Sequence, residues 1–228
     1  MTSDEGFNKL FLLAIRGTLA SPTLEASRLL HNGTAGVPAS VAAAQSLGDL
    51  SHMVHVPVGG PTSAKSEFLI LDLWNSIEGL NKFFANPKVQ EEGGRIFSAR
   101  DPGVWVAAEG FSSYHLPAPF GRNERVVAIA RGDVGNTEKA RALHNRTVVS
   151  QINKARKGGS MVHEAFVKLT PPGSPQSSEF LFLDVWMNAE GMNKHYQDPE
   201  FLQDFQRLFA SPPSTSAWAH PPGDWVEW

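Results

Sequence analysis

The sequence predicts an α+β protein built from two copies of one βαββαβ module, packed sheet to sheet about a pseudo-twofold axis. Three observations predict this class. The chain repeats itself, each repeat alternates strand-like and helix-like periods in the same order, and its strands are apolar on both faces. The length of 228 residues suits one large domain or two small ones.

The repeat is clearest where residues 67–97 align with residues 179–209 without a gap. Thirteen of 31 aligned positions are identical, whereas chance at average residue usage gives about two. Shorter matches extend the repeat upstream, namely LHNxT at 30–34 and 143–147 and MVH at 53–55 and 161–163. A Pro-rich stretch near Phe120 marks the joint, so we expect a first module over 1–119 and a second over 120–228.

Each module begins with a strand and a helix, followed by two more strands. A helical period covers residues 137–157, and its basic last turns suit the helix dipole. The counterpart over 23–47 contains Pro38 in mid-pattern, so we expect two shorter helices there, the second opening at Pro38. Strands are expected at 9–16, 51–58, 67–74 and 103–110, and at 125–131, 161–169, 179–186 and 216–227.

A second helical region follows the third strand of each module. Ser76 and Asn188 are typical N-cap residues at its start. Asn86 and Asp198 each precede a proline, which predicts that the helix restarts there after a kink.

Strand alternation predicts which side chains share a face of the third strand. In the second module Leu183 and Val185 lie on an aliphatic face, while Phe182 and Asp184 lie on an aromatic one. We expect the helices to cover the aliphatic face, so the aromatic face would be buried against the sheet of the other module. Two ferredoxin-like modules would then enclose a barrel, with Asp72 and Asp184 pointing into its interior.

Composition excludes several classes of function. Twenty Lys and Arg against 23 Asp and Glu give a net charge of −3, which does not favour a nucleic-acid partner. The chain has neither a run of about 18 apolar residues nor a basic leader, so we expect no membrane partner and, by default, a cytoplasmic protein. Cysteine is absent, which excludes disulfides and thiolate metal sites.

The third strand and the helix after it carry the motif LDVWMNAEGMNKHYQDPEF at 183–201. An acidic residue two positions before Trp186, His195 nine positions after it, and then Pro199 and Phe201 resemble the antibiotic biosynthesis monooxygenase family of the dimeric α+β barrel superfamily. Members of that family usually pair two identical single-module chains. This chain resembles such a dimer fused as a tandem repeat, and a homodimer of the fused chain is a further expectation.

The resemblance implies that the protein handles a small aromatic or polyketide-like molecule, with oxygenation that needs no cofactor. Two departures from the family pattern bear on this. The first module has Phe83 in place of His195, and the Asn that quinone-forming members place four residues before the Trp is Ile70 or Phe182 here. The alternative function is a non-catalytic ligand-binding or stress-responsive barrel.

Strand geometry predicts one polar cluster in each module. In the second module His163 should lie opposite or diagonal to Asp184, whose carboxylate would raise the His pKa and make a general base. We expect strands one and three to run parallel, which places Arg131 and Trp186 at the same end, where Arg131 could hold an anionic oxygen of the substrate. The equivalent ligand-binding set in the first module is Arg16, His55, Asp72 and Trp74. The alternative is a structural Arg–Asp ion pair, with His satisfying a buried hydrogen bond.

His144 and His195 complete the candidate ligand-binding residues. His144 and its counterpart His31 lie on the first helix, where a haem ligand, a second base or a packing residue are all open interpretations. His52 and His55 are three residues apart on a strand and so point to opposite faces, which argues against a metal site.

Overall fold

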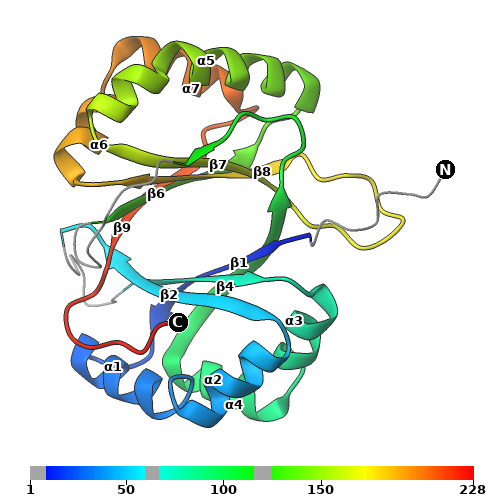
Figure 1. Cartoon of the computed structure of the whole chain (residues 1–228), viewed down its shortest axis with the longest axis vertical. Coiled ribbons are helices and arrows are strands. Elements are labelled where there is room, and N and C mark those ends of the chain that lie inside the picture. Colours follow the sequence, from blue (N-terminus) through cyan, green and yellow to red (C-terminus); the bar gives the residue numbers. More distant parts are fainter. Residues whose placement is uncertain (1–8, 60–66, 116–124) are drawn as a thin grey trace. The chain divides into compact units, whose positions relative to one another are not determined.

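The computed structural model describes residues 9–59, 67–115 and 125–228, and the chain divides into two compact units (Figure 1). Unit 1 comprises Met1–Val106 together with Pro221–Trp228, and unit 2 comprises Ala107–His220. The last eight residues therefore belong to the unit that begins the chain. The joint expected near Phe120 lies outside the described residues.

Unit 1 has the predicted βαββαβ order, with the first helix divided in two. Its four strands form an antiparallel sheet in the order β4-β1-β3-β2, and its helices lie on one face of that sheet (Figure 1). Pro38 opens the second helix, as predicted from its fixed φ. The elements are β1 (Phe11–Leu19), α1 (Leu24–Gly33), α2 (Pro38–Ser46), β2 (Asp49–Pro57), β3 (Glu67–Trp74), α3 (Ile77–Phe84), α4 (Pro87–Ile96) and β4 (Phe97–Ala107).

Unit 2 repeats this order with one uninterrupted first helix. Its strands follow the order β9-β6-β8-β7-β5, and α5, α6 and α7 lie on one face of the sheet (Figure 1). The elements are β5 (Tyr114–His115), β6 (Val126–Asp133), α5 (Thr137–Lys157), β7 (Ser160–Lys168), β8 (Glu179–Trp186), α6 (Ala189–Tyr196), α7 (Pro199–Leu208) and β9 (Ser214–Ala219).

The expected parallel orientation of the first and third strands is wrong. β6 pairs antiparallel with β8, so that Val126 lies opposite Trp186 and Arg131 lies opposite Leu181. The crossover through α5 makes β6 and β7 parallel to each other, and β8 lies between them, antiparallel to both. Residues at the end of β6 therefore meet the start of β8.

The predicted assignment of the sheet faces is also wrong. The aromatic face of β8 lies against the helices of its own unit: the Phe182 ring lies 5.1 Å from the His144 ring of α5, and Trp186 lies 5.2 Å from His195 of α6. In unit 1 Trp74 likewise packs against Phe83 of α3 at 5.6 Å. Because both faces of the strand are apolar, alternation alone does not tell which one the helices cover.

The helices that follow β3 and β8 are fixed by a predicted cap and by a close backbone approach. Asn188 accepts a hydrogen bond from the Gly191 amide at 2.8 Å, and Ser76 does the same for Gly79 at 3.0 Å. A Cβ on Gly191 would lie 1.7 Å from the Gly158 carbonyl oxygen, so only glycine lets α6 start this close to the loop before β7. This approach places α6, and the side chains at its end, beside β8.

Candidate functional site

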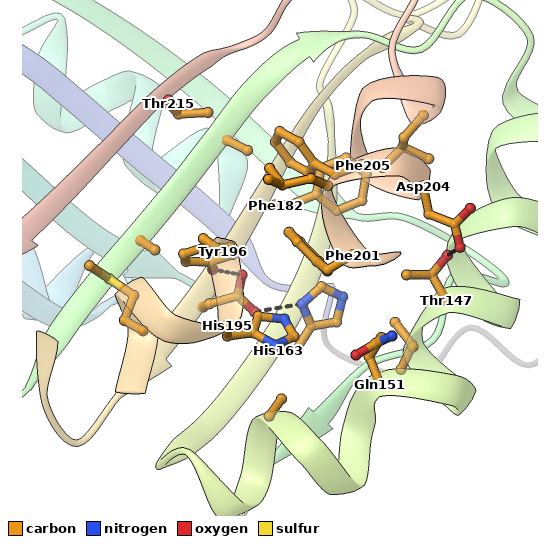
Figure 2. Close-up of a pocket in the computed structure, with 18 of the residues that line it drawn as sticks. Thr147, Gln151, His163, Phe182, His195, Tyr196, Phe201, Asp204, Phe205 and Thr215 are labelled. Atoms are coloured by element: carbon orange, nitrogen blue, oxygen red, sulfur yellow. Dashed lines mark hydrogen bonds and ion pairs between the residues drawn. The ribbon is translucent and has the colours of Figure 1, made fainter. Parts of the chain in front are cut away.

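A cavity of about 410 Å³ lies in unit 2 between the sheet and the helices α5, α6 and α7 (Figure 2). Its volume falls in the range of small-molecule sites. Most of its wall is apolar and aromatic, and includes Leu143, Ile152, Phe182, Trp186, Phe201 and Phe205. The cavity therefore lies in the helix layer of one unit, whereas the sequence placed the polar residues between two sheets.

The predicted contact between His163 and Asp184 is present at one wall of this cavity (Figure 2). The two residues are direct partners across β7 and β8, and His163 Nδ1 lies 2.6 Å from Asp184 Oδ1. The Tyr196 hydroxyl donates a hydrogen bond to the other carboxylate oxygen, Oδ2, at 2.5 Å. Asp184 is thereby held by a strand neighbour and by α6.

His144 of α5 extends this pair to a third side chain. Its Nε2 lies 2.8 Å from the Nε2 of His163, and the two rings are stacked 5.0 Å apart. The sequence singled out both histidines without joining them. The signal was the phase of α5, which turns His144 toward the aromatic face of the sheet once that face is known to be the helix-covered one.

Asn145 completes a chain of four side chains. Its Oδ1 accepts a hydrogen bond from the Ser112 amide at 2.7 Å, while its Nδ2 donates to the Gly110 carbonyl at 2.8 Å. These two backbone groups fix which end of the amide is oxygen, and that oxygen lies 3.2 Å from His144 Nδ1. His144 Nδ1 must then donate, so His144 Nε2 is the acceptor in the contact with His163.

The pKa shifts agree with this arrangement. Burial and the neighbouring His163 charge lower the pKa of His144 to about 4, so this ring is neutral at pH 7. Burial alone would lower the pKa of His163, but the charge and the hydrogen bond of Asp184 outweigh it and raise that pKa. Burial opposes the ionisation of Asp184, yet its contacts with His163 and Tyr196 leave the pKa of the carboxyl below its usual value.

Further polar side chains that do not belong to these four residues also line the cavity (Figure 2). Thr147 of α5 donates to Asp204 of α7 at 2.8 Å, which joins the two helices. Gln151 Oε1 and His195 Nδ1 are buried and have no hydrogen-bond partner among the described residues. Buried polar atoms without partners are uncommon in proteins, and both belong to residues that line the cavity.

Unit 1 contains the same four-residue chain, but with a different histidine from the one expected. His52 Nδ1 lies 2.7 Å from Asp72 Oδ1, and His52 Nε2 lies 3.0 Å from His31 Nε2. The prediction that His55 pairs with Asp72 is wrong, because His55 lies opposite Leu69 in the strand register. Aligning the two MVH matches pairs His55 with His163. In the structure the equivalent of His163 is His52, three residues earlier.

In each unit a segment outside the βαββαβ module places two aromatic rings against the two histidines. The segment is 111–114 in unit 2 and 225–228 in unit 1. In unit 2 Phe111 lies 5.1 Å from the His144 ring, and Tyr114 lies 5.7 Å from the His163 ring. In unit 1 the corresponding rings are Trp225 at 5.3 Å from His31 and Trp228 at 4.5 Å from His52.

The backbone of the C-terminal segment also repeats the contacts with the helix asparagine. The Asp224 carbonyl accepts from Asn32 Nδ2 at 2.7 Å, and the Val226 amide donates to Asn32 Oδ1 at 3.0 Å. These contacts match those of Gly110 and Ser112 with Asn145. The orientation of the asparagine amide is therefore the same in both units.

The two candidate arginines are placed away from these clusters. Arg131 Nε lies 2.6 Å from Glu179 Oε1 at the start of β8, and Arg16 Nη2 lies 3.0 Å from Glu67 Oε1 at the start of β3. The antiparallel pairing of the first and third strands puts these ion pairs at the opposite end of the sheet from Trp186. The expected gathering of Arg131 with Trp186 and His163 is wrong for that reason.

The described residues include neither a metal-binding cluster nor a membrane-spanning helix. No group of three or more His, Asp and Glu side chains there is arranged to hold a metal ion. No helix in the same part of the chain combines the length and the apolar character needed to cross a membrane.

No family model and no curated protein matches the sequence, whereas solved structures match the fold. A protein of Fusobacterium nucleatum, described as a presumed monooxygenase, superposes with a TM-score of 0.61 at 10% identity over 97% of this chain and 98% of its own. An anthrone oxidase-like protein gives 0.56 at 14% identity, over 93% and 91%. A Listeria monocytogenes ferredoxin-fold protein related to antibiotic biosynthesis monooxygenases gives 0.50 at 9%, over 95% and 98%.

This chain has the ferredoxin-type fold of the monooxygenase-like proteins. The resemblance expected from the motif around Trp186 is confirmed at the level of the fold. Identities this low carry no residue roles across, so the function must be argued from the cavity itself.

Proposed function

We propose that unit 2 binds a small planar aromatic molecule in its cavity and oxidises it with molecular oxygen. The observation that supports this most is the combination of an aromatic-lined cavity with a buried, hydrogen-bonded His163–Asp184 pair in its wall. The names of the matched proteins, one presumed monooxygenase and one anthrone oxidase-like protein, favour the same class of reaction.

The walls suit a flat ring system. Phe182, Phe201, Phe205 and Trp186 offer aromatic faces and edges, against which a planar ligand gains both buried apolar area and ring–ring contacts. Among the polar side chains of the wall, His163 with Asp184 forms one group and Thr147 with Gln151 of α5 forms another (Figure 2). A ligand with oxygen substituents at separated positions would meet both groups.

The chemistry proposed for such a ligand begins with loss of a proton. Removal of a proton from an anthrone-type CH₂ gives a carbanion whose charge is shared with the ring oxygen, and such an anion reacts with O₂. The carbon gains one oxygen atom as a carbonyl, and the second oxygen atom leaves as water with the two hydrogens of the CH₂ group. The protein must accept the first proton and stabilise the anion, and a buried imidazolium is suited to the second task.

A second candidate function is binding without turnover. The contacts of Thr147 with Asp204 and of His163 with Asp184 also serve to join helices and strands. A protein that only binds an aromatic ligand would use the same cavity and would need no proton acceptor.

The experiment that separates these functions uses anthrone as the probe. Binding is followed by quenching of the tryptophan fluorescence, and oxidation is followed by oxygen uptake and by formation of anthraquinone above the protein-free rate. We expect saturable binding and a protein-dependent rate that His163→Ala abolishes. Binding without any rate, in the wild type at every pH, would support the second function. Absence of binding would overturn both.

A further inference from the structure

The hydrogen bonds of the four-residue chain Asn145–His144–His163–Asp184 fix its protons. Asn145 Oδ1 can only accept, so His144 Nδ1 carries a proton and His144 Nε2 carries a lone pair. His163 Nε2 faces that lone pair at 2.8 Å and must donate to it. His163 Nδ1 faces the Asp184 carboxylate at 2.6 Å and donates as well. Both nitrogens of His163 therefore carry protons, and the ring is an imidazolium.

The repeat supplies an independent copy of this arrangement. In unit 1 Asn32, His31, His52 and Asp72 follow the same order, with His31 Nδ1 at 3.1 Å from Asn32 Oδ1. The backbone groups of Asp224 and Val226 orient the Asn32 amide as those of Gly110 and Ser112 orient Asn145. Two separate segments thus fix the same protonation pattern.

None of these four side chains is suited to take a proton from a ligand. The lone pair of His144 is occupied by His163, and both His163 nitrogens are protonated. Asp184 is a weak base, because, despite its burial, the hydrogen bonds from His163 and Tyr196 keep the pKa of the carboxyl below its usual value. A general base needs an unprotonated atom within reach of the substrate. The base must therefore be another side chain of the cavity wall.

Of the three histidines in the cavity wall, His195 is the one that does not belong to the hydrogen-bonded set Asn145–His144–His163–Asp184 (Figure 2). It lies near the end of α6, its ring 5.2 Å from Trp186 and 4.4 Å from Phe201. Its Nδ1 is buried without a hydrogen-bond partner among the described residues, and the ring lines the cavity. The equivalent position on α3 of unit 1 is Phe83, so this histidine is specific to unit 2.

We propose that His195 is the proton acceptor of the cavity and that His163 is a fixed cation that stabilises the resulting anion. This assignment rests on the proposed function, and it replaces the role of general base expected for His163. A neutral imidazole at His195 takes the proton, and the negative charge that develops on the ligand faces the imidazolium of the His163–Asp184 pair.

The electrostatic surroundings of His195 suit this role. Burial lowers its pKa below the usual value, and Lys154 of α5 and His163 of β7 act in the same direction. Asp184 of β8 and Asp198, the cap of α7, oppose the shift but do not reverse it. The ring is therefore mostly unprotonated at pH 7, and the alkaline limit of activity would come from loss of the His163 proton.

The test combines the protonation states with turnover. Nitrogen-15 NMR of the whole chain at pH 7 should show His163 and His52 doubly protonated and His195 neutral. In turnover of anthrone, His195→Phe, which copies Phe83, should lower kcat by on the order of 100-fold or more while Kd changes little. The fall of kcat/KM on the acid side should disappear in this variant. Phe83→Leu, at the same helix position of unit 1, is the matched control and should leave kcat unchanged.

Different results overturn the assignment and the proposed function. A neutral His163 in the NMR spectrum, or an unchanged kcat and acid limb in His195→Phe, would overturn the assignment even if anthrone is oxidised. If the wild type does not oxidise anthrone, the proposed function fails, but the NMR experiment still decides the protonation states. His195→Gln keeps the polarity and roughly the volume of the side chain, so it controls for loss of kcat through altered packing. We expect it to be as inactive as His195→Phe. An active His195→Gln would overturn the assignment.

Discussion

At the scale of single residues, the two histidines of each pair differ in charge, one neutral and one cationic, because their surroundings differ. Asp184 holds a proton on His163, whereas burial and the charge of His163 keep His144 neutral. A pair of neighbouring imidazoles thus carries one positive charge, and the surroundings of the pair determine which ring carries it. The Asn that follows the helix histidine in both repeats fixes the tautomer of that ring, because its Oδ1 accepts from Nδ1.

The low pKa of His144 predicts a loss of stability in acid. Its pKa is about 4 when folded and about 6.5 when unfolded, so between these values the unfolded chain binds the additional proton. The free energy of unfolding therefore falls as the pH falls, by about 2 kcal/mol from this group alone at pH 5. Urea unfolding at pH 7 and pH 5 should show that His144→Gln, which keeps an acceptor for His163, loses less stability than the wild type. An equal loss in both proteins would contradict the shift.

Sequence reasoning was more successful for the pair than for its surroundings. The contact between His163 and Asp184 follows from the hairpin register, which is a local property of two adjacent strands. His52 was missed because identity of MVH suggested the wrong alignment, and a β-bulge near the start of each second strand shifts the register without a clear sequence signal. The roles of Asn145 and Tyr196 depend on helix packing, which no short pattern specifies.

At the scale of elements, the predicted caps and helix restarts are confirmed, and so are the strands except the last. That strand was expected over 216–227 but covers Ser214–Ala219, because Pro221–Trp228 belong to unit 1. The other errors concern orientation. The long helix covers Thr137–Lys157 as expected, and Asp198 caps α7 before Pro199. The relative direction of β6 and β8 and the face covered by the helices were predicted wrongly. Both depend on how the crossover helix returns the chain, which is a property of the whole module.

The approach of α6 to the loop before β7 predicts an unusually costly glycine substitution. Gly191→Ala would place its Cβ 1.7 Å from the Gly158 carbonyl oxygen, and Gly79→Ala would do the same against Leu47 in unit 1. Because backbone must move, we expect each variant to lose about 2 kcal/mol or more of unfolding free energy. Thermal or urea unfolding measures this loss.

The control for these variants is Gly94 on the exposed side of α4. A Cβ at this position meets no atom within 4 Å, so Gly94→Ala should be neutral or stabilise the protein by up to about 1 kcal/mol. If Gly191→Ala were as stable as Gly94→Ala, the close approach of α6 would not exist in solution. In that case Gly191→Ala should also leave the ligand affinity of unit 2 unchanged.

At the scale of the whole molecule, the repeat predicts near-identical modules with unequal chemistry. Only the second module has a histidine at the position of His195, where the first has Phe83. We therefore expect titration calorimetry with anthraquinone, the product and a non-reacting ligand, to give one site per chain. Two equivalent sites would show that the difference between the modules does not matter for binding.

The pairing of the modules about a twofold axis stays a prediction. Superposing residues 67–97 on 179–209 in a crystal structure should also overlay the rest of the two modules, with their sheets face to face. Modules that lie apart, each with a bare sheet face in solvent, would contradict it. The prediction rests on the apolar character of both strand faces, because the helices of a module cover only one of them.

The return of Pro221–Trp228 to unit 1 has a consequence for the order of events at the ribosome. Unit 2 is continuous from Ala107 to His220, whereas unit 1 lacks Trp225 and Trp228 until residues 221–228 have been translated and have left the ribosome. During synthesis the domain encoded second is thus complete first, and the domain encoded first waits with His31 and His52 uncovered. A released chain truncated after residue 220 should resist protease in residues 125–220 and remain sensitive in residues 9–59.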